Sequence, residues 1–524
     1  MRKAHIKKWK AEGTRIDFDK RSITMMNFIR IILLIFCGLI VSLIPIGGLF
    51  AQEVENLDDI IQGFEEEEKP SHELEDLMKG FEDESVEDQK SDPSQNDEFM
   101  EGFDEDTESK TADKETTKDK PSTLSLDGDF TFSSSYNFSP DAISPWRGLS
   151  MLRSELELEL KKKFSDNWQG QISVRGFYDL VYVLRGKENY TRQVLDDLEK
   201  ELELEDTFIQ GSLTASLDTK IGRQVVAWGT LDNLRVTDVL NPLDLRVPGL
   251  TDIDDLRLPV TMIKLDYYFG NWDLGGMVIP EIRFSKLPVF GSDFYPLSEP
   301  RPPEDTPEDG FRNPEYAGAL TGTFSGWDIG FYLSSIYDDQ SYGQVVTPGS
   351  PPQLVLKHAR ITMLGTAFNI ALGNWLFKAE AAWLEDLQYT STPGVEYSRF
   401  DLGGGIEYSG FTETTISLEA ANRHILDYSE LLILPPAELR ENEFQWALRI
   451  MRDFMNDTLT LSLLASTFGI KADDGAFERI DAVYDITDAL SVRGGVVFYQ
   501  SGEKGLYKNI GGNDRLFFEM KYSF

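Results

Sequence analysis

The chain has 524 residues, 90 of them acidic and 51 basic, and its formal net charge is −39. Such a negative protein is not expected to bind nucleic acid, which needs clustered Lys and Arg. It has one cysteine, Cys37, inside a segment that we expect to be removed, and four histidines without metal-ligand spacing. We therefore predict no disulfide, metal site or cofactor.

The amino terminus has the pattern of a secretory signal. Residues 31–50 form an apolar run behind Arg30, broken by Pro45 and followed by Ala51, a small residue at a cleavage point. The run is also long enough to cross a bilayer, so an uncleaved inner-membrane anchor remains the alternative. We assign 1–51 to the signal, with a long basic leading segment that makes Met25 or Met26 a candidate start.

Residues 52–122 form an acidic segment poor in large apolar residues, and we predict a disordered periplasmic tail. One pattern occurs three times in it: an acid, two apolar residues, a spacer, Gly, and then Phe64, Phe81 or Phe103. In the first two copies the apolar residues follow the i, i+3, i+4, i+7 spacing of one helix face. This favours a motif that docks in a groove of a periplasmic partner. An acidic spacer is the alternative.

Residues 123–524 alternate like strands between short and long connections. Eight short turns are expected. They lie at Ser165-Asp166-Asn167, Ser216-Leu217-Asp218, Phe269-Gly270-Asn271-Trp272, Phe324-Ser325-Gly326-Trp327, Leu372-Gly373-Asn374-Trp375, Tyr408-Ser409-Gly410, Asn456-Asp457 and Ile486-Thr487-Asp488. This predicts an all-β fold, a transmembrane antiparallel β-barrel of 16–18 strands, with 18 the best estimate. A soluble β-sandwich is the alternative.

Long, proline-rich connections are expected at the other end of the strands. They lie near 140–147, 186–201, 230–259, 281–314, 338–352, 429–441 and 501–513, and 191–205 is expected to form a short helix with Val194, Leu195 and Leu198 on one side. Strand parity then identifies the inner face. The residues predicted to line a wet pore are Arg153, Glu155, Glu157, Glu159, Arg175, Asp179 and Arg449.

A signature follows in residues 221–249. Gly222-Arg223-Gln224-Val225-Val226-Ala227-Trp228-Gly229, then Asn241-Pro242-Leu243-Asp244 and Pro248-Gly249, resembles a porin-like outer-membrane family of Gram-negative bacteria known only as a domain of unknown function. The resemblance implies a barrel in the outer membrane and no established substrate. Some members are encoded beside transporters of lipids or other hydrophobic molecules, which makes such cargo an alternative.

The long segment 230–259 is expected to fold against the barrel wall, because a loop of this length does not stay structureless in a compact barrel. If it folds inward, it narrows the pore. The residues assigned to this constriction are Trp228, Asp232, Asp238, Asn241, Pro242 and Asp244. A latch that closes the extracellular end is an equal alternative.

The last strand alternates apolar and polar residues up to an aromatic end. Phe518, Met520, Tyr522 and Phe524 resemble the carboxyl-terminal signal of outer-membrane barrels. The expected partners are therefore the outer-membrane bilayer and the barrel assembly machinery.

We predict a channel or transporter that passes small solutes or hydrophobic molecules delivered by a partner. The alternative is an outer-membrane anchor whose tail recruits a periplasmic or inner-membrane complex. An enzyme is not expected, since Ser417 and His424 have opposite strand parity. A TonB-dependent receptor is not expected either, because the tail is not a folded plug.

Overall fold

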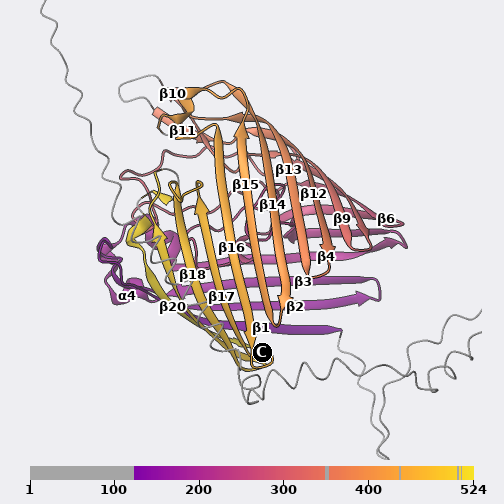
Figure 1. The fold of residues 1–524 in the computed structure, drawn as a ribbon, viewed down its shortest axis with the longest axis horizontal. Helices are drawn as coiled ribbons and strands as arrows, with labels where there is room; N and C mark the ends of the chain where they lie inside the picture. Colours follow the sequence, from indigo (N-terminus) through magenta and orange to yellow (C-terminus); the bar gives the residue numbers. More distant parts are fainter. Residues whose placement is uncertain (1–122, 348–352, 436–437, 504–506, 509) are drawn as a thin grey trace, which may run out of the picture. The chain divides into compact units, whose positions relative to one another are not determined.

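The computed structural model describes residues 123–347, 353–435, 438–503, 507, 508 and 510–524. The predicted signal, the tail and its three Gly-Phe motifs lie outside these residues. The described chain forms a closed antiparallel barrel of 18 strands with few helices (Figure 1). The predicted fold class is confirmed, including the best estimate of the strand number.

The barrel strands follow one another around the wall in chain order. They are β1 (Leu124–Asn137), β2 (Gly148–Ser165), β3 (Trp168–Asp179), β4 (Lys200–Thr214), β5 (Leu217–Gln224), β6 (Val260–Phe269), β7 (Trp272–Ile279), β8 (Glu315–Phe324), β9 (Trp327–Tyr337), β12 (Arg360–Leu372), β13 (Trp375–Gln388), β14 (Glu396–Phe411), β15 (Thr414–Ile425), β16 (Asn442–Phe454), β17 (Leu459–Phe468), β18 (Gly475–Thr487), β19 (Leu490–Gln500) and β20 (Arg515–Ser523). A separate hairpin, β10 (Tyr342–Thr347) and β11 (Gln353–Lys357), extends the connection between β9 and β12 (Figure 1).

The barrel closes between its first and last strands. β1 pairs with β20 from Asp129–Ser523 to Asn137–Arg515, and the backbones of Gly128 and Phe524 exchange two hydrogen bonds of 2.9 Å. Phe518, Tyr522 and Phe524 are exposed on the outer face of β20. The side chains between them, among them Glu519 and Lys521, face the interior. A role of these outer residues in assembly stays a prediction.

Turn positions agree with the sequence in most hairpins. The turn predicted at Tyr408–Gly410 is wrong, because β14 continues to Phe411 and the chain reverses at Thr412 and Glu413. Glu413 has the left-handed φ of 51° that the reversal requires. The connections at 389–395 and 469–474 are not among the predicted long connections, because they are shorter than those and lack a long proline-rich run.

The predicted helix at 191–205 is shorter than expected. It consists of α5 (Arg192–Val194) and a π-helical turn, η2 (Leu195–Glu199), and β4 begins at Lys200. The Thr191 hydroxyl accepts a hydrogen bond from Val194 N (3.2 Å) and caps the start of the helix. Val194 and Leu198 are buried with Trp146. The same connection holds α4 (Val181–Leu184) and η1 (Lys187–Asn189); the other helices are α6 (Ile253–Leu256), η3 (Glu430–Ile433) and η5 (Ile510–Gly512).

The outer face of the barrel is apolar. Large side chains with the outward parity, such as Leu156 and Leu158 on β2 and Leu202 on β4, are exposed, Leu202 by 80%. Aromatic side chains gather near the short turns: Phe324 stacks on Trp327 (centroids 4.2 Å apart) and Trp375 contacts Tyr408 (4.4 Å). No helix in the described ranges has the length and apolar character needed to cross a bilayer.

Candidate pore and internal loop

The segment between β5 and β6, residues 225–259, lies inside the barrel; we call it the internal loop. It leaves the wall after Gln224 and returns at Val260, and α6 forms near its end. Its backbone and side chains contact inward-facing residues of β13, β15, β16, β18 and β19. These strands lie across the barrel from β5 in the strand order. The loop therefore spans the interior.

Two buried carboxylates hold the first part of the loop by its backbone. Glu380 on β13 accepts hydrogen bonds from Thr230 N (2.5 Å), Leu231 N (2.8 Å) and Thr237 N (3.0 Å). Glu419 on β15 accepts from the next two amides, Asp232 N and Asn233 N, at 2.8 Å each. Both glutamates are at most 3% exposed. Removing Glu380 would leave the buried N–H groups of Leu231 and Thr237 unpaired, each at a cost of about 1–3 kcal/mol.

Close approach between loop and wall requires glycine at two positions. Gly229 has φ +92°, and a Cβ there would lie 2.4 Å from Glu380 Oε1. On the wall, a Cβ at Gly403 would lie 2.8 Å from both Leu231 and Val236. Trp228 stacks on Tyr332 of β9, with centroids 4.9 Å apart. The Trp-Gly pair of the signature therefore seats the loop against the wall.

The neck of the loop is closed by Asn241. Its Oδ1 accepts from Val226 N (2.8 Å), and its Nδ2 donates to Gln224 O (3.3 Å) and Leu258 O (2.8 Å). Pro242 O accepts from Leu258 N (2.7 Å). The Asn-Pro pair thus ties together the two strands of chain that enter and leave the loop.

Ion pairs hold the second part. Arg246 bonds to Asp244 and to Glu201 of β4 (2.6 and 2.7 Å), and Asp252 pairs with Arg449 (2.9 Å) and with Arg479. Burial alone would raise the pKa of Asp244, but the hydrogen bonds and charge of Arg246 outweigh it and hold that pKa below its ordinary value of 3.8. The pKa of Asp252 is lowered in the same way, with Arg479 as the main partner opposing burial.

The loop packs an apolar core against one side of the barrel. Its Leu234, Val236 and Leu240 are buried against inner-face residues such as Met262, Met363 and Ala382. These wall residues belong to β6 through β16. We call this the loop-filled side. Apolar side chains fill the interior there, and the loop and the wall form one hydrophobic core.

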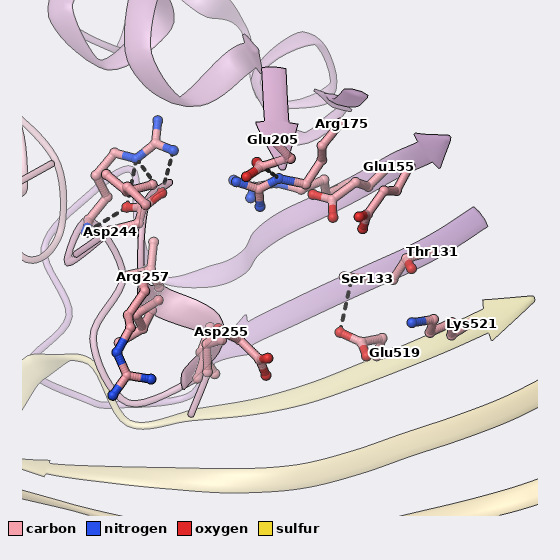
Figure 2. A pocket seen from close by; sticks show the side chains of 18 of the residues that line it. Thr131, Ser133, Glu155, Arg175, Glu205, Asp244, Asp255, Arg257, Glu519 and Lys521 are labelled. Atoms are coloured by element: carbon pink, nitrogen blue, oxygen red, sulfur yellow. Dashed lines mark hydrogen bonds and ion pairs between the residues drawn. The ribbon is translucent and has the colours of Figure 1, made fainter. Parts of the chain in front are cut away.

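The other side of the interior holds a cavity of about 630 Å³, which we call the upper cavity. Its wall comes from β1–β4, β19 and β20, and its opposite face comes from the internal loop between Asp244 and Pro259. Figure 2 shows Glu155, Arg175 and Glu205 on the wall facing Asp244, Asp255 and Arg257 of the loop. A second, lower cavity of about 680 Å³ lies nearer the short turns, along β2–β6.

The upper cavity is lined by charges of both signs with an acidic excess. Eight acidic residues, Glu155, Glu157, Glu159, Glu205, Asp206, Asp244, Asp255 and Glu519, lie with six basic ones, Arg153, Arg175, Arg246, Arg257, Arg493 and Lys521, which gives a net charge of −2. Four of the cations pair with carboxylates outside the lining: Arg246 with Glu201 (2.7 Å), Arg257 with Asp238 (2.9 Å), Arg493 with Asp481 (3.0 Å) and Lys521 with Asp129 (2.9 Å). One of the acids, Glu159, pairs with Lys161 outside the lining. The charge of these cations is partly neutralised outside the cavity, so the lining keeps an acidic excess.

Of the seven residues predicted to line a pore, some line the upper cavity and others make structural contacts instead. Arg153, Glu155, Glu157, Glu159 and Arg175 line the upper cavity. Asp179 lies outside this lining, and its buried carboxylate accepts hydrogen bonds from Leu152 N (2.9 Å) and Val181 N (3.0 Å) at the end of β3. Arg449 faces the interior but pairs with Asp252 of the loop.

Of the residues assigned to a constriction, only Asp244 lines the upper cavity. Trp228, Asn241 and Pro242 hold the loop as described above. Asp232 pairs with Lys378 of β13, and Asp238 pairs with Arg235 (3.1 Å) as well as Arg257. Parity reasoning missed the wall partners Glu380, Glu419 and Arg479. Each is a charged residue at an inward position of a strand with apolar neighbours, which is the signal that could have found them.

Ser417 and His424 lie on opposite faces of β15. Ser417 is buried on the inner face, while His424 contacts Asn442 (3.2 Å) on the other face. The two side chains therefore do not form a catalytic pair. In the part of the chain that the structure describes, no group of three His, Cys, Asp or Glu side chains is placed to hold a metal ion.

Comparison with solved structures finds outer-membrane porins, at low identity. The crystal structure of OccAB2 from Acinetobacter baumannii matches with 11% identity and a TM-score of 0.46, covering 76% of this chain and 98% of that one. OccK9 (OpdG) of Pseudomonas aeruginosa matches with 13% identity and 0.46, covering 76% and 97%. A BenF-like porin from Pseudomonas fluorescens Pf-5 matches with 11% identity and 0.45, covering 76% and 98%.

Sequence comparisons identify a family but no characterised relative. No curated protein matches the chain. A family model described as "Protein of unknown function (DUF1302)" matches residues 149–524, which is most of the chain and includes the signature segment 221–249. The chain therefore belongs to this family of unknown function, DUF1302.

Proposed function

We propose that the protein is a porin-type channel of the outer membrane, through which small polar or charged solutes cross along the upper cavity. The observation that carries the proposal is a charged cavity of about 630 Å³ inside a closed barrel whose outer face is apolar. Charged residues face the interior on the same strands that present leucines outward, as a bilayer outside and water inside require.

The lining favours polar solutes over hydrophobic cargo. At roughly 30 Å³ per molecule, the cavity volume corresponds to about twenty waters. An apolar molecule would have to displace the water around fourteen charged side chains and give no hydrogen bond in return. The cavity therefore suits solutes that keep or replace those hydrogen bonds, and a hydrophobic molecule delivered by a partner fits it poorly.

The test is conductance of the purified full-length protein in planar bilayers. A channel gives discrete current steps that scale with salt concentration, and swelling of liposomes in a small sugar but not in a large oligosaccharide. The matched control is the same preparation unfolded by heat before addition. A folded barrel that gives neither current nor swelling would contradict the proposal and favour the anchor whose tail recruits a partner.

A further inference from the structure

The two cavities lie one below the other along the same wall. The upper cavity is lined by Glu159 of β2 and Ser173 of β3, and the lower one by Lys163 and Gln169, which are further along the inner faces of the same strands toward the short turns. Among the described residues that line them, the only one common to both is Val225. Val225 is the first residue of the internal loop after β5.

A β-bulge in the wall lies beside this junction. β3 and β4 pair from Ile172–Thr207 to Val174–Leu204, so two residues of β4, Glu205 and Asp206, lie opposite the single Ser173. A regular strand would turn one of two consecutive side chains outward. The bulge allows both carboxylates to line the upper cavity, and bulges are frequent where a side chain has to be re-aimed.

The charges at the bulge are unequally compensated. Glu205 pairs with Arg175 at 2.8 Å. The Asp206 carboxylate lies beside the backbone N–H of Val225, and its Oδ1 is inaccessible and has no hydrogen-bond partner among the described residues. Below the junction, Lys220 lies over the Phe208 ring (3.7 Å) and Lys264 pairs with Asp266 (2.7 Å). Asp206 thus lies beside the junction residue, and its charge is offset by Lys220 without the direct ion pair that Glu205 has with Arg175.

We propose that solutes pass from the upper to the lower cavity at Val225, and that this junction, with Glu205 and Asp206 beside it, is the constriction that selects for small cations. The inference rests on the proposed channel function and adds the route that solutes take and the sign of the charge that the channel prefers. A solute cation moving past the bulge meets two carboxylates, Glu205 paired with Arg175 and Asp206 offset at longer range by Lys220, and the lining of the upper cavity before it carries a net charge of −2. Rings of carboxylates give cation selectivity in other channels.

Side-chain size at position 225 tests the route. Val225→Trp should reduce the single-channel conductance several-fold, and Val225→Ala should increase it, because the added or removed volume lies where the cavities meet. Ile209→Trp on β4 is the matched control, since Ile209 is 48% exposed on the outer face. All variants must show the heat-sensitive gel mobility of a folded barrel. If Val225→Trp and Val225→Ala both conduct like the parent, the route is wrong although the channel function stands.

Charge at the bulge tests the selectivity. Asp206→Asn should lower the permeability of K⁺ relative to Cl⁻, measured as the reversal potential in a salt gradient, by about two- to fourfold, the effect of one charge about 5 Å away in water. Glu205→Gln should lower it further, because it also frees Arg175. Glu385→Gln, where Glu385 accepts from the outward Trp383 (3.1 Å), should change nothing. A parent channel that prefers anions, or a ratio of K⁺ to Cl⁻ permeability that is unchanged in both bulge variants, would overturn the proposed cation selectivity. No current from the folded parent would overturn the channel itself.

Discussion

The loop-filled side and the cavity side of the barrel are built from the same kind of strand but differ in what covers their inner faces. On β12 and β13, inward residues such as Met363 and Ala382 are apolar and are covered by Leu234 and Val236 of the internal loop. On β2 the inward residues are Arg153, Glu155, Glu157 and Glu159, and they face open space. The internal loop thus creates both environments, because its apolar side chains pack against the loop-filled side and its charged residues face the upper cavity.

The comparison shows what the family signature encodes. Four residues of the signature hold the loop in place. Trp228 stacks on Tyr332, and Gly229 allows the backbone to approach Glu380. Asn241 closes the neck, and the Gly249 carbonyl accepts a hydrogen bond from Arg479 (3.4 Å). Each of these contacts joins the loop to the wall or to itself. We infer that these four residues specify an internal loop, and that the solute is set by the residues that line the cavities, many of which belong to β1–β4 and lie outside the signature.

The largest effect should follow from removing the core of the loop. Deleting residues 232–244 removes the contacts to Glu419 and the apolar packing of Leu234, Val236 and Leu240, so single-channel conductance should rise several-fold. Removing the β10–β11 hairpin, a separate sheet, is the control and should leave conductance within the range of the parent. Equal conductance of the loop deletion and the parent, both folded, would show that the loop-filled side does not limit the pore.

Adding a single methyl group at Gly229 should loosen the internal loop. Gly229→Ala puts a Cβ against Glu380 at a φ of +92°, which costs about 1–3 kcal/mol. The result should be a lower midpoint of thermal unfolding and current that fluctuates between levels. Gly276→Ala, with nothing within 4 Å of the added Cβ, is the matched control and should shift stability by less than about 1 kcal/mol. Identical unfolding midpoints and current traces for both variants would count against the close contact between Gly229 and Glu380 as a support of the loop.

A smaller effect is expected from acid. The folded-state pKa values of Asp244 and Asp252 are lowered, so the stabilisation from their ion pairs is complete above the ordinary value of 3.8 and is lost as pH falls through the lower folded values. Conductance fluctuations should therefore be unchanged from neutral pH down to about 5 and should increase only below about 4. Loosening that begins near pH 6 would show that the acid response is set by groups other than Asp244 and Asp252, such as the glutamates that hold the first part of the loop.

The smallest effect on the barrel is expected from the tail, which lies outside the described residues. We propose that Phe64, Phe81 and Phe103 anchor a periplasmic partner, with three weak copies acting together. Changing all three to Ala should abolish partner capture in a crosslinking pull-down and leave conductance unchanged. Capture of the same proteins by parent and variant would reduce the repeat to a spacer.

The sequence was most informative where the two faces of a strand meet different solvents. On β2, leucine alternates with Glu and Arg, so the period of two predicts both the strand and its inner face. On β13, apolar residues lie on both faces around Glu380, because the partner of the inner face comes from the loop about 150 residues earlier in the chain. Strand parity cannot identify that partner. The bulge at Glu205 and Asp206 was also beyond prediction, since neighbouring strands impose it.

The central claim is that solutes pass on the cavity side and not on the loop-filled side, and cysteine labelling in a bilayer tests it directly. With Cys37 changed to Ser, Gln171→Cys would place a thiol in the upper cavity and Ala382→Cys one beneath the loop, where Ala382 is 1% exposed. A charged methanethiosulfonate reagent should alter the current through the Gln171→Cys channel within the recording and leave the Ala382→Cys channel unchanged. A current that responds only in Ala382→Cys, or equally in both, would contradict the account.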